Sequence, residues 1–270
     1  MKLRYIALLG ALFAGSIFGG PPAASVAAEP AKPTKAVISP EASAALVHMG
    51  QTLRADAFSF QANTIRVYSD AGGDMLHIFH TLKVVVRRPN RMFAESTGDD
   101  GANKIVFDGK TAWVYSPQQN KYAEIAVPGG TIEGLLKEAV GRLGVDFPLA
   151  DFLSEAPNKA FLTGVTSGRV VNTVTIDGAP YLHLLFTQPP GIELELWLSK
   201  NQQSLPARLI VTYLALPGQP NFIAEFSNWN FDIHPAEAEF TFQPPAGAQR
   251  VALKPVQAPP PPAQPKGAKQ

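Results

Sequence analysis

The segment from Val84 to Ala126 constrains the fold more than any other part of this 270-residue chain. It opens with the β-branched run Val84-Val85-Val86, which Pro89 must end, because a proline in a central strand removes a hydrogen-bond donor from the ladder. Further on, Asp108-Gly109 lies between two apolar runs and supplies the positive φ angles of a tight hairpin turn. The segment therefore predicts short strands that follow one another through tight turns.

Similar period-two patterns recur along the rest of the chain and predict an antiparallel meander. Helical spacing is confined to Pro40–Arg54, to a segment that opens at Thr131 and stops at Gly144, and to a short stretch from Pro148 to Leu153. Strands are predicted at 58–68, 76–87, 91–95, 104–107, 111–115, 122–125, 169–176, 181–186, 192–198, 207–214, 222–231 and 239–242.

The two faces of these strands differ in polarity. Ile192, Leu194, Leu196 and Leu198 alternate with polar side chains, as in a sheet with one buried face, whereas the strand from Tyr181 to Phe186 is apolar on both faces. A strongly curved sheet around apolar helices explains both patterns. Any unfilled volume inside it would form an apolar cavity, and a solidly packed interior is the alternative.

The first 28 residues have the parts of a secretory signal peptide. Lys2 and Arg4 give a positive start, residues 5–18 form an apolar run, and Ser25-Val26-Ala27-Ala28 provides small residues for cleavage. The run is shorter than the ~20 residues of a membrane-spanning helix, which argues against a retained anchor. We expect cleavage after Ala28 and a soluble periplasmic product with no transmembrane segment.

Charge and cysteine content narrow the possible partners. The chain has 23 Lys and Arg against 22 Asp and Glu, and removal of the signal peptide leaves 21 against 22. Because basic and acidic residues are nearly equal in number, the chain lacks the excess of Lys and Arg that binds nucleic-acid phosphates, and no nucleic-acid partner is expected. The sequence contains no cysteine and therefore neither a disulfide nor the acylated cysteine of a lipoprotein.

Low-order segments on both sides delimit one domain. We assign residues 1–28 to the signal peptide, 29–38 to an Ala/Pro/Lys linker, 39–249 to the domain and 250–270 to a proline-rich tail. The domain, of roughly 210 residues, is long enough for one all-β or α+β core. The tail has few apolar residues to bury and is expected to be extended and disordered.

Two motifs together resemble the LolA/LolB-like superfamily of periplasmic lipoprotein carriers. They are Arg88-Pro89-Asn90-x-x-Phe93 and, after a gap, Ile105-Val106-x-Asp108-Gly109-Lys110-Thr111-x-Trp113. The region from Val171 to Asn230 and the proline-rich tail are more similar to an uncharacterised family of predicted periplasmic proteins, DUF2092. The resemblance implies a mainly β (α+β) fold: an open antiparallel β-barrel of about eleven strands, with helices plugging its mouth. Asp108 and Gly109 would form the motif turn, and Trp113 would lie on the strand after it.

The resemblance also implies a role for Arg88. In that superfamily the arginine before the proline reaches under the helical lid and bonds its backbone carbonyls, which holds the empty cavity shut. A guanidinium offers five fixed donors to carbonyls left unpaired at helix ends. The alternative is that Arg88 is an ordinary charge at a strand end. Arg87 should point to the opposite face of the sheet.

The residue types that carry catalysis or bind metals are not suitably arranged. His77 and His80 are three apart on a predicted strand and face opposite sides, so they cannot share a metal without a bulge. Glu193 and Glu195 share a face, which is best explained as a solvated outer face. Ser167 is one position too late for a Gly-x-Ser-x-Gly elbow. We expect no catalytic residue, no metal and no cofactor, and the protein is not expected to be an enzyme.

These patterns lead to two hypotheses about function. The first is a non-enzymatic periplasmic protein that binds a hydrophobic ligand, such as an acyl chain of a lipid or lipoprotein, in an apolar cavity. The second is an envelope sensor or adaptor that uses the same fold to bind a partner protein, with the tail as a docking segment.

Overall fold

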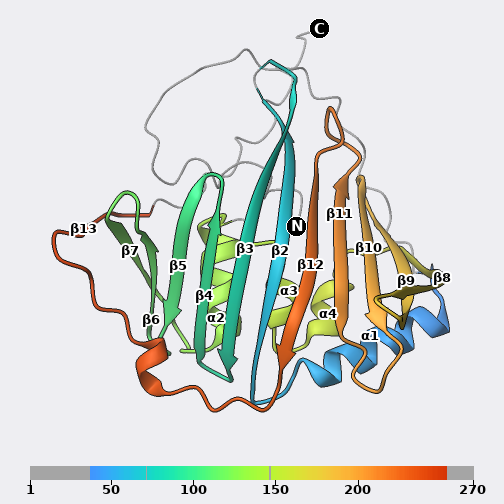
Figure 1. Ribbon diagram of the computed structural model, residues 1–270, viewed down its shortest axis with the longest axis horizontal. Coiled ribbons are helices and arrows are strands. Elements are labelled where there is room, and N and C mark those ends of the chain that lie inside the picture. Colours follow the sequence, from blue (N-terminus) through green and yellow to red (C-terminus); the bar gives the residue numbers. More distant parts are fainter. Residues whose placement is uncertain (1–36, 71, 146, 254–270) are drawn as a thin grey trace, which may run out of the picture.

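One mainly antiparallel sheet bends around a group of helices in the computed structural model, which describes residues 37–70, 72–145 and 147–253 (Figure 1). In this part of the chain the sheet has thirteen strands, in the order β1-β8-β9-β10-β11-β12-β2-β3-β4-β5-β6-β7-β13. The edge strands β1 and β13 are not paired with each other, so the sheet stays open. The predicted fold class is therefore confirmed. The predicted signal peptide, residues 29–36 and residues 254–270 lie outside the described residues.

The described residues form eleven longer strands, the number that the resemblance implies, and two short strands in addition. The two-residue strands β1 (Val37–Ile38) and β13 (Gln249–Arg250) pair in parallel with β8 and β7. The strands between them are β2 (Ala57–Ser69), β3 (Met75–Arg87), β4 (Arg91–Gly98), β5 (Gly101–Phe107), β6 (Thr111–Ser116), β7 (Lys121–Ala126), β8 (Ser167–Ile176), β9 (Ala179–Gln188), β10 (Ile192–Ser199), β11 (Pro206–Tyr213) and β12 (Asn221–Asn230).

The first two helices begin at the capping residues that the sequence predicts. The Ser39 hydroxyl accepts a hydrogen bond from the Ala42 amide at 3.2 Å, and α1 (Pro40–Thr52) has its proline in the first turn. The Thr131 hydroxyl accepts one from the Gly134 amide at 3.0 Å at the start of α2 (Ile132–Leu136). This helix continues directly into a π-helix, η2 (Lys137–Arg142). Two short helices follow, α3 (Ala150–Leu153) and α4 (Pro157–Phe161), of which the sequence predicted only the first.

The strand predicted at 239–242 is wrong. The segment instead forms a 3₁₀ helix, η3 (Glu237–Phe240), after which the chain runs to β13. The alternation of Phe240 and Phe242 is typical of a strand, but Pro235, Pro244 and Pro245 on both sides lack the amide hydrogens that a ladder needs. Phe240 is buried through the helical turn, with 1% of its surface exposed.

Aromatic packing fixes the helices to one half of the inner face of the sheet. Phe60 is buried on β2, and its ring centroid lies 4.6 Å from that of Trp229. Phe152 of α3 contacts Phe226 of β12 edge-to-face at 5.4 Å, and α4 is fixed to β9 through the Phe161–Phe186 contact, also at 5.4 Å. The interior is therefore tightly packed toward the end of the sheet where β3 finishes, which is the lower end in Figure 1.

The packing around Phe60 predicts a large loss of stability when its ring is removed. Phe60→Ala should lower the free energy of unfolding by about 3–5 kcal/mol, because the cavity left behind cannot collapse fully. Phe79→Ala is the matched control, since Phe79 lies on the neighbouring strand with 52% of its surface exposed. It should change stability by less than about 0.5 kcal/mol. Urea denaturation measures both, and equal losses would contradict the assigned core.

Candidate functional site

A cavity of about 700 Å³ occupies the other half of the inner face, toward the β2–β3 turn. The strands present alternate side chains to it, and the loop after η2 forms its opposite wall through Phe147, Pro148 and Leu149. Its volume lies within the ~300–1,000 Å³ range of ligand pockets. Most of the lining is apolar, including Ile78, Leu82, Ala94, Ile105, Val114 and Phe222.

A few polar side chains line the same cavity. Arg66 of β2 and Tyr213 of β11 are both partly buried, and the Arg66 guanidinium lies 5.8 Å from the centre of the Phe222 ring. Burial lowers the pKa of Arg66, and burial likewise raises the pKa of Tyr213. His80 Nε2 and Asp100 Oδ1 are 2.6 Å apart. The cavity thus combines a large apolar wall with a small group of convergent polar atoms.

Apolar side chains are also exposed at this end of the sheet. Tyr68 and Leu76 are paired across β2 and β3, and each has 39% of its surface exposed. Leu214, in the turn after β11, is 41% exposed, while Tyr68 itself lines the cavity. Apolar surface is therefore exposed beside the cavity at this end of the sheet.

Arg88 connects the ends of two helices to the end of β3. Its Nη1 donates to the Leu153 carbonyl and its Nη2 to the Leu53 carbonyl, both at 3.0 Å. Leu53 is the C-cap of α1 and Leu153 is the last residue of α3, so these carbonyls have no partner within their own helices. Burial lowers the pKa of Arg88, and the carboxylates of Glu155 and Glu133 oppose that shift.

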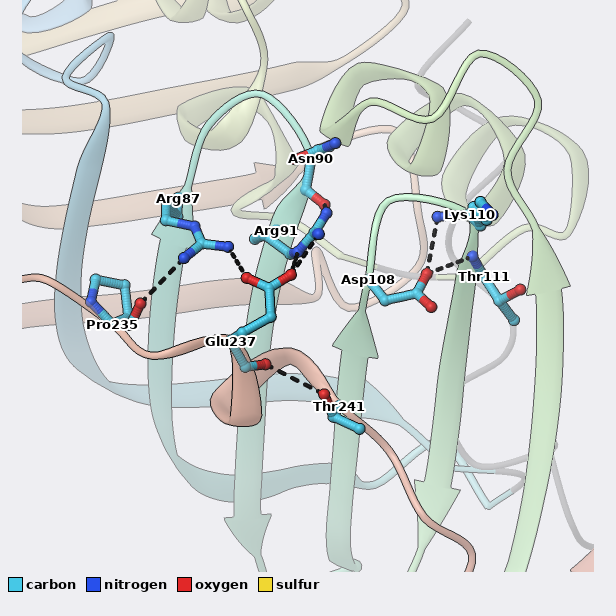
Figure 2. Close-up of polar contacts among 9 residues, drawn as sticks. All are labelled: Arg87, Asn90, Arg91, Asp108, Lys110, Thr111, Pro235, Glu237 and Thr241. Carbon is cyan, nitrogen blue, oxygen red and sulfur yellow. Dashed lines mark hydrogen bonds and ion pairs between the residues drawn. The ribbon is translucent and has the colours of Figure 1, made fainter.

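Arg87 points to the other face of the sheet, as the alternation predicts, and contacts the C-terminal segment (Figure 2). Its Nη1 donates to the Pro235 carbonyl at 3.2 Å, and it forms an ion pair with Glu237. Arg91 Nε donates to the same carboxylate at 2.7 Å. These bonds lower the pKa of Glu237. Through Glu237, Arg87 and Arg91 thus bind η3 to the β3–β4 hairpin.

The other motif residues form a turn and an aromatic contact outside the cavity lining. Asp108 Oδ1 accepts hydrogen bonds from the Lys110 and Thr111 amides at 2.8 and 2.9 Å (Figure 2). Gly109 has a φ of +94°, and a Cβ there would lie 2.6 Å from Arg91 Nη1. The ring of Trp113 lies 6.0 Å from that of Phe242, on the outer face.

The remaining candidates from the sequence do not converge. His183 and Glu195 bond at 2.7 Å, and His183 stacks on Trp197 with ring centroids 4.1 Å apart. Among the described residues, no group of three or more His, Cys, Asp or Glu is placed to hold a metal ion. Sequence reasoning missed Arg66 and Tyr213, because a charge within a strand pattern does not reveal which face the curvature will enclose.

None of the helices in the described ranges is long and apolar enough to cross a lipid bilayer.

The chain thus forms an open, curved sheet with internal helices and a largely apolar cavity. The family model described as "Predicted periplasmic protein (DUF2092)" matches residues 42–254. The chain therefore belongs to this family of predicted periplasmic proteins. No curated protein matches the sequence.

Several solved structures have a similar fold. An uncharacterised conserved protein from Thermus thermophilus is 13% identical, with a TM-score of 0.46 over 78% of this chain and 99% of that one. A LolA superfamily protein from Nitrosomonas europaea is 13% identical, with a TM-score of 0.39 over 74% and 98%. The Mycobacterium tuberculosis lipoprotein LppX is 17% identical, with a TM-score of 0.43 over 73% and 99%. These similarities concern the fold alone.

The contacts of Glu237 predict a pH-dependent contribution to stability. Because its pKa is lowered in the folded protein, the contribution is present above the pKa of Glu237 in the unfolded chain. It is lost as the pH falls through the pKa of the folded protein. Glu237→Gln should therefore lower the melting temperature near neutral pH, and the difference from wild type should vanish in acid. Glu239→Gln, on the same helical turn, is the control for differential scanning fluorimetry. A Glu237→Gln difference that persists unchanged in acid would contradict the assigned ion pairs.

Proposed function

We propose that this protein binds a hydrophobic ligand, such as an acyl chain of a lipid, in its cavity and holds it in the periplasm without catalysing a reaction. The observation that carries the proposal is the cavity of about 700 Å³ with its largely apolar lining. Each methylene moved out of water contributes about 0.8 kcal/mol to binding. A lipid in an aqueous compartment therefore gains most from a site of this kind.

Membership of a family of predicted periplasmic proteins supports the compartment. Export through the N-terminal signal peptide, with cleavage after Ala28, is part of the proposal. The periplasm lies between membranes, where a lipid must cross water to move from one to the other. A protein that encloses an acyl chain would lower the cost of that passage.

In this proposal Arg88 holds the helices in the closed arrangement. It bonds the final residue of α3, and the loop just before this helix supplies Phe147, Pro148 and Leu149 to the cavity wall. The second bond, to Leu53, joins the end of α1 to the same guanidinium. A ligand that needs more room would have to displace α3 and break these bonds.

One observation favours the second hypothesis, an adaptor that binds a partner protein. The strand β1 pairs only with Ser167 and Gly168 of β8, and in the described ranges no strand covers the outer edge of β8 beyond them. Such an edge can accept an extended peptide as an added strand. Protein purified from a native periplasm and analysed by mass spectrometry separates the two functions: a co-purifying lipid supports carriage, and a stoichiometric protein partner without lipid supports the adaptor.

Filling the cavity should abolish binding of an apolar probe. Ser96 of β4 lines the cavity, whereas the next residue, Thr97, is exposed. Ser96→Trp should therefore weaken binding of the neutral dye N-phenylnaphthylamine by about tenfold or more, and Thr97→Trp should leave it unchanged. Dye fluorescence measures affinity, and circular dichroism checks the fold. A folded Ser96→Trp variant with wild-type affinity would exclude the cavity as the ligand site.

Loosening the helices should make the cavity easier to occupy. Arg88→Leu removes two bonds from a charged donor, each worth about 1.5–3 kcal/mol, so the protein should be less stable but bind the same dye more tightly. Arg54→Leu is the control, because Arg54 is exposed next to the Leu53 carbonyl. Arg87 is unsuitable as a control because it binds Glu237. Identical dye affinities and release rates in wild type and both variants would rule out a closing role for Arg88.

A further inference from the structure

Two turns form an exposed apolar surface at the end of the sheet that lies beyond the cavity. They are the tip of the β2–β3 hairpin, residues 68–70 and 72–76, and the β11–β12 turn, residues 214–220, and both project from the same end of the molecule in Figure 1. The turns lie against each other, since a Cβ added at Gly218 would lie 2.7 Å from the Met75 sulfur. Together they form one surface, which we call the rim.

The rim is continuous with the lining of the cavity. Tyr68 and Ser69 line the cavity from the hairpin, and Leu216 and Pro217 line it from the β11–β12 turn. Tyr68 also belongs to the exposed apolar side chains of the rim, together with Leu76 and Leu214. An acyl chain that moved between the cavity and a lipid bilayer placed against the rim would therefore follow apolar side chains and expose few methylenes to water.

The charges of the rim favour a surface without net charge. The β11–β12 turn has no ionisable side chain, and neither part of the rim contains Lys or Arg. Two aspartates, Asp70 and Asp74, are its charged residues, and Asp70 Oδ1 accepts hydrogen bonds from the Gly72 and Asp74 amides at 2.8 and 2.9 Å. Attraction to anionic lipids requires Lys or Arg near the membrane surface. A zwitterionic bilayer therefore suits the rim, whereas an anionic one does not.

The exposed apolar area suits a bilayer more than a second protein. A large aromatic side chain has about 150–250 Å² to bury, so three side chains that are 39–41% exposed offer no more than roughly 300 Å². A stable protein interface buries ~800 Å² on each partner. A bilayer surface, in contrast, accepts a few inserted apolar side chains, and tyrosine is enriched at the level of the lipid head groups.

We infer that the rim docks this protein reversibly on the surface of a zwitterionic lipid bilayer, with Tyr68, Leu76 and Leu214 inserted among the head groups. The inference rests on the proposed function, since it supplies the surface at which a lipid ligand is collected or delivered. Two of the three inserted residues, Leu76 and Leu214, do not line the cavity, so docking and ligand binding can be changed separately.

Flotation of the full mature chain with phosphatidylcholine vesicles tests the docking. The wild type should float with these vesicles, and adding phosphatidylglycerol to them should not increase the bound fraction. Leu214→Glu should reduce the bound fraction about tenfold, because it places a charge among the head groups. Val47→Glu is the matched control and should float like the wild type, since Val47 is 39% exposed on α1, near the opposite end of the sheet (Figure 1).

A fluorescent label measures insertion directly and does not depend on the Leu214→Glu variant. The sequence contains no cysteine, so a single introduced cysteine is the only labelled position. Leu214→Cys labelled with nitrobenzoxadiazole should gain severalfold in emission when phosphatidylcholine vesicles are added, and lipids with a nitroxide on the acyl chain should quench it. Val47→Cys with the same label should show neither change. A label at position 214 that does not respond to vesicles would overturn the inference.

The outcomes separate this inference from the proposed function, because binding of N-phenylnaphthylamine without vesicles reports on the cavity alone. Leu214→Glu should keep the wild-type affinity for the dye. A wild type that binds the dye but does not float, or that floats only with phosphatidylglycerol, would overturn the docking and leave the cavity as a ligand site. A dimer that Leu214→Glu dissociates, detected by sedimentation velocity without lipid, would assign the rim to a second copy and also overturn the docking. Failure to bind both the dye and the vesicles would overturn both proposals.

Discussion

The packing of aromatic side chains between the short helices and the sheet is the constraint on which the rest of the structure depends. A single open sheet buries its inner face only if something fills the space that it encloses. Phe152 and Phe161 fill part of it by contacting Phe226 and Phe186. Because α3 and α4 are so short, they cover one end of the inner face and leave the other as the cavity. The lengths of these two helices thus determine which part of the inner face is left as the cavity.

Two adjacent arginines at the end of β3 act on opposite faces of the sheet. Arg88 reaches the helix ends inside, at the Leu53 and Leu153 carbonyls, whereas Arg87 reaches Glu237 outside. The period of two along a strand is sufficient to separate them. The end of β3 therefore fixes both the ends of α1 and α3 on the inner face and the C-terminal segment on the outer face.

The sequence predicts the strands of the sheet better than it predicts the residues of the site. The long strands follow from alternation and from Pro89 and Asp108-Gly109, since these act locally. The strand predicted from the alternation of Phe240 and Phe242 is wrong, because the prolines on either side lack the amide hydrogens that a strand ladder needs. Arg66 could not be recognised as part of the site, because its burial depends on which face the whole sheet encloses. The contacts of Arg88 with helix-end carbonyls were expected from the resemblance, not from local pattern.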